Sequence, residues 1–119
     1  MTTPYILVAD LAIEAPIPAR GILSQTLSNE KDVEFLLFAF AAGEQLSERT
    51  SARPAIIHIL EGEGELTAGT DAFPARPGTW LRMEPELKHS LVARTPMRMA
   101  LYLLPRKTKP AGSAPADDE

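Results

Sequence analysis

The sequence predicts a single all-β domain, a sandwich or barrel of short strands. The chain has 119 residues, the length of one domain, and 45% of them are hydrophobic, which is enough to bury a modest core. Eleven prolines and seven glycines interrupt the chain, and no stretch between them keeps a helical period. The runs between these breaks are short, β-prone and bounded by turn residues, which is typical of a sandwich or barrel.

The elements follow from these breaks in chain order. A helical turn is expected at 10–14, ahead of Pro16 and Pro18, and the clearest turns lie at 62–64, 69–71 and 77–78, where glycine permits tight backbone geometry. The β-prone runs predict ten strands, at 5–8, 21–27, 33–41, 45–49, 55–61, 65–68, 72–75, 79–83, 90–93 and 97–104.

Three of these strands, 33–41, 55–61 and 97–104, carry apolar residues on both faces. One face can fill the interior while the other contacts a second sheet or a second subunit. We therefore expect a homodimer.

Charge and composition exclude several classes of partner. The formal net charge is −4, and the 12 Lys and Arg residues are scattered, whereas nucleic acids and anionic membranes require a concentrated basic surface. The absence of cysteine excludes disulfides, thiolate metal sites and cysteine nucleophiles. No basic leader and no apolar run of about 20 residues is visible, so a cytoplasmic protein is expected.

The composition changes abruptly after Pro105. Residues 106–119 have no apolar pattern, and their basic and acidic residues cancel. The expected organisation is one domain over 1–105 followed by a flexible tail over 106–119.

Two motifs carry a resemblance to a known family. The first lies within 43–64 and ends in the turn Leu60-Glu61-Gly62-Glu63-Gly64, and the second lies within 77–90, with Pro77-Gly78 at its start and Pro85 shortly before His89. In this order and spacing they resemble the two motifs of the cupins. The resemblance implies a single-domain cupin, a conserved β-barrel of the RmlC-like jelly-roll (double-stranded β-helix) type.

The resemblance also implies where a metal would bind. Metal-dependent cupins use two histidines and a glutamate from the first motif and one histidine from the second, and these positions correspond to Arg49, Ser51, Ala55 and His89. Only His89 can serve as a ligand. A guanidinium roughly 4 Å from a divalent ion costs on the order of 8 kcal/mol at an effective dielectric constant of about 20. No metal cofactor is therefore expected.

A remodelled metal site is the alternative. The second histidine, His58, is expected on the outside of its strand, because alternation from Ala55 turns Ile57 and Ile59 inward. A bulge would break this parity. His58 and His89 would then hold a divalent ion such as Fe, Mn, Ni or Zn together with Glu44 or Glu48, and the chain would be a dioxygenase or isomerase.

The leading hypothesis is metal-free binding of a small organic molecule, with anions as one option, in an apolar cup. The candidate ligand-binding residues are Arg49, Ser51, Trp80 and His89. The Arg49 guanidinium in such a cup can bind a carboxylate or phosphate through two hydrogen bonds. Its structural alternative is that Arg49 forms a salt bridge with Glu48 or Glu84 and binds no ligand. Such a chain acts as a sensor, carrier or accessory domain.

Each candidate residue also has a purely structural interpretation. His89 is either a site residue or a structural histidine, and Trp80 and Phe73 either line a cavity or fill volume. The acidic run Glu61, Glu63 and Glu65 is interpreted as a solvated edge. Two further alternatives stay open: a metal-independent enzyme with His89 as general base and Arg49 holding the substrate, and a structural or interaction module that binds no ligand.

Overall fold

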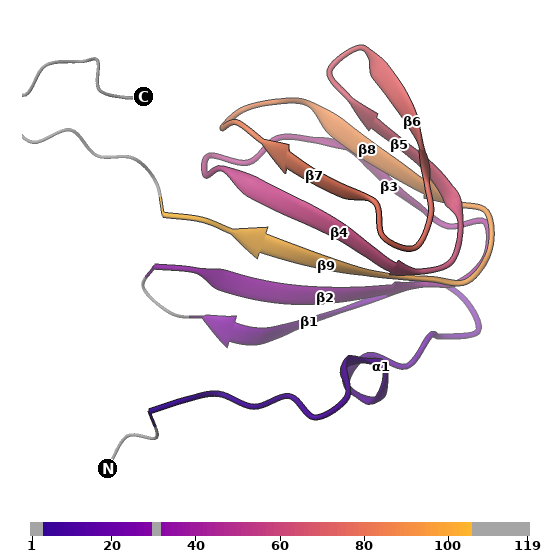
Figure 1. Cartoon of the computed structure of the whole chain (residues 1–119). Helices are drawn as coiled ribbons and strands as arrows, with labels where there is room; N and C mark the ends of the chain where they lie inside the picture. The colour runs from indigo at the N-terminus through magenta and orange to yellow at the C-terminus, as the bar shows by residue number, and fades with distance from the viewer. Residues whose placement is uncertain (1–3, 30–31, 106–119) are drawn as a thin grey trace, which may run out of the picture.

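The computed structural model describes residues 4–29 and 32–105, so the expected tail at 106–119 lies outside the described residues. Within them, one short helix precedes nine strands (Figure 1). The elements are α1 (Leu11–Glu14), β1 (Ile22–Asn29), β2 (Glu34–Phe40), β3 (Gln45–Arg49), β4 (Ala55–Glu61), β5 (Gly64–Ala68), β6 (Asp71–Ala75), β7 (Trp80–Met83), β8 (His89–Ala93) and β9 (Met97–Leu103).

The strands form two antiparallel sheets. The five-stranded sheet has the order β1-β2-β9-β4-β7, and the four-stranded sheet has the order β3-β8-β5-β6. Strands that are distant in the sequence pair within each sheet, as β2 does with β9 and β3 with β8. The all-β architecture that the turn spacing predicts is therefore confirmed.

Nine of the ten predicted strands are present, each end within two residues of the prediction. The tenth, predicted at 5–8, is wrong, because this segment pairs with no strand in the described part of the chain. Its side chains Tyr5, Ile6 and Leu7 remain 69%, 61% and 76% exposed. A β-prone run becomes a strand only where another strand satisfies its backbone hydrogen bonds.

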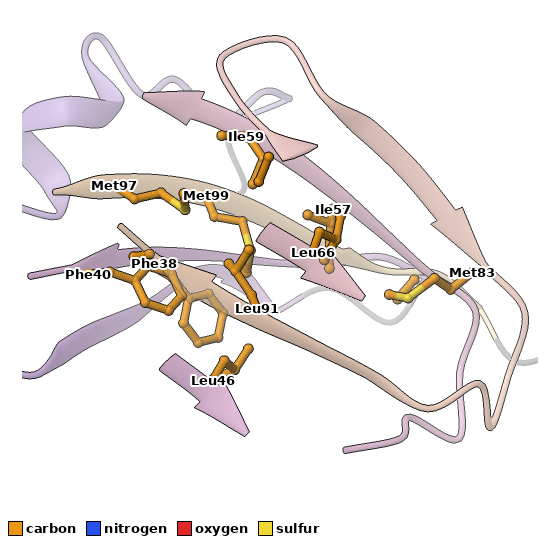
Figure 2. Packing of buried hydrophobic residues seen from close by; sticks show 13 residues of the cluster. Phe38, Phe40, Leu46, Ile57, Ile59, Leu66, Met83, Leu91, Met97 and Met99 are labelled. Atoms are coloured by element: carbon orange, nitrogen blue, oxygen red, sulfur yellow. The ribbon is translucent and has the colours of Figure 1, made fainter. Parts of the chain in front are cut away.

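The main core lies between the two sheets, as Figure 2 shows. Alternation on β4 turns Ala55, Ile57 and Ile59 into this core, as predicted, each at most 2% exposed. Side chains from both sheets complete it: Phe38, Phe40, Leu46, Leu66, Ala75, Met83, Leu91, Ala93, Met97 and Met99.

A second, smaller cluster lies on the outer face of the five-stranded sheet. It is built on Leu37 and Ala39 of β2 and Ala100 of β9. The segment around α1 covers this cluster with Ala15, which is completely buried, and with the partly buried Leu11 and Ile17. The strands with two apolar faces therefore have one face in the barrel and the other partly under the N-terminal segment.

The two ends of the barrel differ in how well they are closed. The end formed by the β4–β5 and β8–β9 loops, here called the Gly62 end, buries most of its inward side chains completely, among them Phe40, Ile59 and Met97, while Ile22 is partly buried. The end formed by the β3–β4 and β7–β8 loops is here called the His89 end. Ala55 and Met83 are buried there, but several inward leucines are only partly buried: Leu36, Leu81, Leu87, Leu101 and Leu103. Some apolar side chains are therefore partly exposed to solvent at the His89 end.

Within residues 4–29 and 32–105, no helix is long and apolar enough to span a membrane.

Candidate functional site

His89 is the only polar or charged residue in the buried class among the described residues, with 7% of its surface exposed. It begins β8, in the middle of the four-stranded sheet, with Arg49 of β3 on one side and Ala68 of β5 on the other. Its neighbour on the same face, Leu91, is part of the main core. The imidazole therefore lies on the interior side of the barrel at the His89 end.

One hydrogen bond orients the His89 ring. Nδ1 lies 3.0 Å from the carbonyl oxygen of Leu87. A carbonyl can only accept a hydrogen bond, so Nδ1 carries the proton. The neutral ring then presents Nε2 as an acceptor, and no hydrogen bond to Nε2 is present within the described ranges. A buried polar atom without a protein partner is suited to bind a ligand group.

Arg49 lies opposite His89, and a bulge in β3 puts it there. The register runs from Leu46 opposite Leu91 to Arg49 opposite His89, so two residues of β3 face a single residue of β8. Directly opposite residues in an antiparallel pair point to the same face. Arg49 therefore shares the interior face with Leu46 and His89, at the rim of the barrel.

The Arg49 guanidinium is not in either of the salt bridges that the sequence suggested. Glu48 lies 3.8 Å from Lys88, and Glu84 lies 2.9 Å from Arg82. Arg49 itself is exposed, and its Nε donates to the carbonyl oxygen of Ser47 at 3.2 Å. No ion pair of Arg49 occurs in the part of the chain that the structure describes. Its terminal nitrogens face solvent at the rim, where they can bind an anion.

Ser51 shapes the loop that follows Arg49. Its Oγ accepts a hydrogen bond from the amide of Arg53 at 3.1 Å and donates to the carbonyl oxygen of the same residue at 3.0 Å. Its own carbonyl accepts from the amide of Glu86 at 2.7 Å, which joins the two loops of the His89 end. The hydroxyl is therefore engaged within its own turn.

Trp80 lies outside the barrel. It pairs with His58, which in turn pairs with Ala100 of the outer cluster. Trp80 is 58% exposed, so it does not line the interior with Arg49 and His89 as the sequence analysis expected. Phe73, in contrast, lies on the interior side of edge strand β6. It is directly across from the core residue Leu66 and is 39% exposed.

The residues of the alternative metal site are not brought together. His58 lies on the outer face of the five-stranded sheet, whereas His89 lies on the inner face of the other sheet. Glu44 accepts a hydrogen bond from the amide of Gly21 at 3.1 Å, and Glu48 faces Lys88. In residues 4–29 and 32–105, no three His, Asp or Glu side chains gather as a ligand set.

The residues that the cupin resemblance assigns to a metal do not fit one either. The interior around Ala55 is apolar, because Ala55 lies opposite Met83 on one side and Leu103 on the other. His89 would be a single imidazole donor next to the permanently charged Arg49. First-row metals need several converging imidazole or carboxylate donors.

Sequence reasoning missed Arg53, which ties the β3–β4 loop at the His89 end to the end of β9. Its Nε donates to the carbonyl of Leu104 at 2.7 Å and one terminal nitrogen to that of Leu103 at 3.0 Å. The same guanidinium reaches the carbonyl of Asp32 at 3.3 Å and the carboxylate of Glu34 at 3.5 Å. No feature of the sequence distinguishes this arginine from the exposed ones, because its partners lie about 20 and 50 residues away along the chain.

The three carboxylates of the acidic run, Glu61, Glu63 and Glu65, do not share one environment in the structure. Glu61 forms an ion pair with Arg98 at 2.5 Å, while Glu63 and Glu65 are exposed. This part of the chain belongs to the Gly62 end, away from His89.

Solved structures of other proteins share this architecture. A conserved protein of unknown function from Streptococcus pyogenes is similar with a TM-score of 0.76 and 24% identity, over 91% of this chain and 93% of that one. A cupin superfamily protein from Desulfitobacterium hafniense has a TM-score of 0.76 and 24% identity, over 86% and 94%. KdgF from Halomonas sp. has a TM-score of 0.68 and 19% identity, over 73% and 82%.

No protein-family model matches the sequence, and no curated protein matches it. The structural likenesses extend over most of each chain at identities below 25%, and they agree with the fold that the two sequence motifs predicted. The chain therefore has the fold of the small, RmlC-like cupin barrels.

Proposed function

We propose that this protein binds a small organic acid at the His89 end of the barrel, without a metal ion. The observation that carries the proposal is the His89 ring, buried and fixed through Nδ1 by the Leu87 carbonyl, with Nε2 unbonded among the described residues. The neutral ring accepts a hydrogen bond from a ligand hydroxyl or a protonated acid, and the charged ring donates one to a carboxylate.

The surroundings of His89 favour an apolar acid over a polar one. The inward leucines of this end, together with Phe73, offer a partly exposed apolar wall. Arg49 lies opposite His89 and supplies a cation whose fork geometry matches a carboxylate. A ligand with a carboxylate at one end and a hydrocarbon body uses both features. A protein with such a site serves as a sensor, carrier or accessory domain.

Histidine NMR tests the proposal directly, because the chain has two histidines and they lie on different sheets. Hexanoate is titrated while the ring nitrogens of His58 and His89 are followed in long-range ¹H–¹⁵N spectra, with hexanol as the uncharged probe. We expect the His89 ring to shift and the His58 ring to stay unchanged, and we expect Nδ1 of His89 to be protonated before hexanoate is added.

One variant and its matched control test the role of Arg49 in this site. Arg49→Gln removes the cation and should weaken hexanoate binding by at least about tenfold, because a charged hydrogen bond contributes roughly 1.5–3 kcal/mol. Arg94→Gln is the matched control, since Arg94 is exposed in the β8–β9 loop at the Gly62 end. Equal affinity of Arg49→Gln and wild type, or equal shifts of both histidines, would contradict the proposal.

A second candidate, a metal-independent enzyme with His89 as general base, is favoured by the same hydrogen bond. A base needs a partner that fixes its tautomer, and the Leu87 carbonyl supplies it, 3.0 Å from Nδ1. His89→Gln distinguishes the two candidates when chemical turnover of a bound acid is followed by NMR. The enzyme candidate expects turnover by the wild type and its loss in the variant, whereas the carrier expects no turnover in either.

A further inference from the structure

Asp71 lies in the same row of paired residues as Arg49 and His89. The register places Arg49 of β3 opposite His89 of β8, whose partner on β5 is Ala68. Ala68 in turn lies opposite Asp71, the first residue of β6. Directly opposite residues of antiparallel strands point to the same face. The row therefore crosses the interior side of the four-stranded sheet, with a cation on edge strand β3 and a carboxylate on edge strand β6.

The Asp71 carboxylate is available to a ligand. Asp71 is exposed, and it forms no ion pair within residues 4–29 and 32–105. Glu34 also occupies an inward position at the His89 end, since it lies opposite Leu103. Its carboxylate, however, faces Arg53 at 3.5 Å. Asp71 therefore differs from Glu34 in having its negative charge unmatched by a cation of the described chain.

The turn before Asp71 is attached to the segment that orients His89. The amide of Gly69 donates a hydrogen bond to the carbonyl oxygen of Lys88 at 2.7 Å. Gly69 also lies against Leu87, because a Cβ built on this glycine would be 3.5 Å from Cδ1 of the leucine. The carbonyl of Leu87 is the group bonded to Nδ1 of His89. Asp71 and the imidazole are therefore held by neighbouring contacts.

An apolar surface lies beside this row. Phe73 follows Asp71 by two residues, so the alternation of β6 places both side chains on one face. Phe73 is 39% exposed and lies opposite the core residue Leu66. Ala68, between His89 and Asp71, carries only a methyl group. A hydrocarbon chain that runs from His89 toward Asp71 would meet apolar side chains along its length.

We propose that the ligand of the His89 end is an acid that carries an ammonium group several carbons away from its carboxylate. This inference rests on the function proposed above and names the class of acid. The carboxylate binds Arg49 beside His89, the carbon chain lies on Phe73, and the ammonium group pairs with Asp71.

The spacing of the row selects among amino acids. His89 and Asp71 are two strands apart, about 10 Å at the backbone. An amino acid with its ammonium group at the far end of a carbon chain spans this separation. An α-amino acid does not, because its two charges are attached to the same carbon.

Three probes test this selection: hexanoate, 6-aminohexanoate and norleucine. Norleucine is an isomer of 6-aminohexanoate that carries the same two charges next to each other. Each probe is titrated while the His89 ring nitrogens are followed by NMR, and affinity is expressed relative to hexanoate for the same variant. This ratio cancels the contribution of the carboxylate, which all three probes share.

Asp71→Asn should lower the preference for 6-aminohexanoate over hexanoate by about two- to fivefold, the effect of one exposed ion pair. The preference for norleucine over hexanoate should not respond to this variant. Asp71→Glu keeps the charge and should retain the preference for 6-aminohexanoate. Glu65→Gln is the matched control, because Glu65 is exposed on the same hairpin and points to the outer face, next to the inward Leu66.

A ratio that is the same in wild type and Asp71→Asn, while hexanoate still shifts His89, would overturn this inference and leave the proposed function standing. An equal response of norleucine, or of Glu65→Gln, would also overturn it, because the effect would then be general electrostatics. If none of the three probes shifts the His89 ring, the proposed function fails, and this inference fails with it.

Discussion

Gly62 joins β4 to β5, and its surroundings exclude any side chain. Its φ is +87°, in the left-handed region. A Cβ built there would overlap the carbonyl oxygen of Pro96 and lie 2.7 Å from Cα of Met97. Both contacts are backbone atoms at the start of β9, so no rotamer change relieves them. We predict that Gly62→Ala strongly destabilises the fold.

Gly43 provides a control with the same backbone conformation. Its φ is also +87°, but nothing lies within 4 Å of its built Cβ. Gly43→Ala therefore carries only the cost of an L-residue in the left-handed region, about 1–2 kcal/mol. Gly62→Ala adds a steric cost of about 2–3 kcal/mol, for a total of about 3–5 kcal/mol. The difference between the two variants isolates the contact with the β8–β9 connection.

Urea unfolding followed by far-UV circular dichroism measures both variants. All samples need one protein concentration, because the apparent stability of a chain that self-associates depends on concentration. With an m-value of about 1–2 kcal/mol/M, the steric cost lowers the Gly62→Ala midpoint about 1–3 M below that of Gly43→Ala. Equal midpoints would refute the reasoning, since they would show that the approach of Gly62 to β9 contributes nothing.

Three further substitutions, one of them paired with a control, test other parts of the structure. Arg53→Met removes the hydrogen bonds that tie the β3–β4 loop to the end of β9, and should lower the free energy of unfolding by about 1–3 kcal/mol in thermal denaturation; an unchanged melting temperature would show that these bonds do not stabilise the fold. Leu66→Ala should cost about 2–5 kcal/mol in urea, because Leu66 is completely buried, whereas Val92→Ala on the exposed outer face should cost less than about 1 kcal/mol, and equal losses would argue against this core. Arg98→Gln should release the N-terminal segment from β9, seen as faster tryptic cleavage at Arg20, and an unchanged cleavage rate would show that the bond to Ala15 is not needed.

Local pattern was sufficient to predict nine of the strands and one face of β4. A strand alternates its side chains with a period of two, so Ala55, Ile57 and Ile59 had to share a face, and the structure buries all three. Glycine and proline positions predicted the turns, because their backbone restrictions act locally. The order of the two motifs predicted the cupin barrel, in agreement with the solved structures.

The geometry of the candidate site depends on how strands that are distant in the sequence pair with one another. The burial of His89 and the direction of Arg49 depend on the pairing of β3 with β8. The sequence of neither strand predicts the bulge between Leu46 and Arg49. Likewise, the face of Trp80 depends on its register with β4 and not on the composition of β7. One register step would reverse each of these side chains.

The sequence by itself determined the class of fold, the positions of nine strands and the apolar lining of the barrel, because alternation and turn geometry are properties of a few adjacent residues. Only the tertiary structure decided that segment 5–8 pairs with no strand of the described residues, that several leucines at the His89 end stay partly exposed, and that Arg53 ties the β3–β4 loop to the end of β9. Those features depend on which distant segments meet, and hydrogen-bond partners tens of residues apart leave no trace in the local pattern.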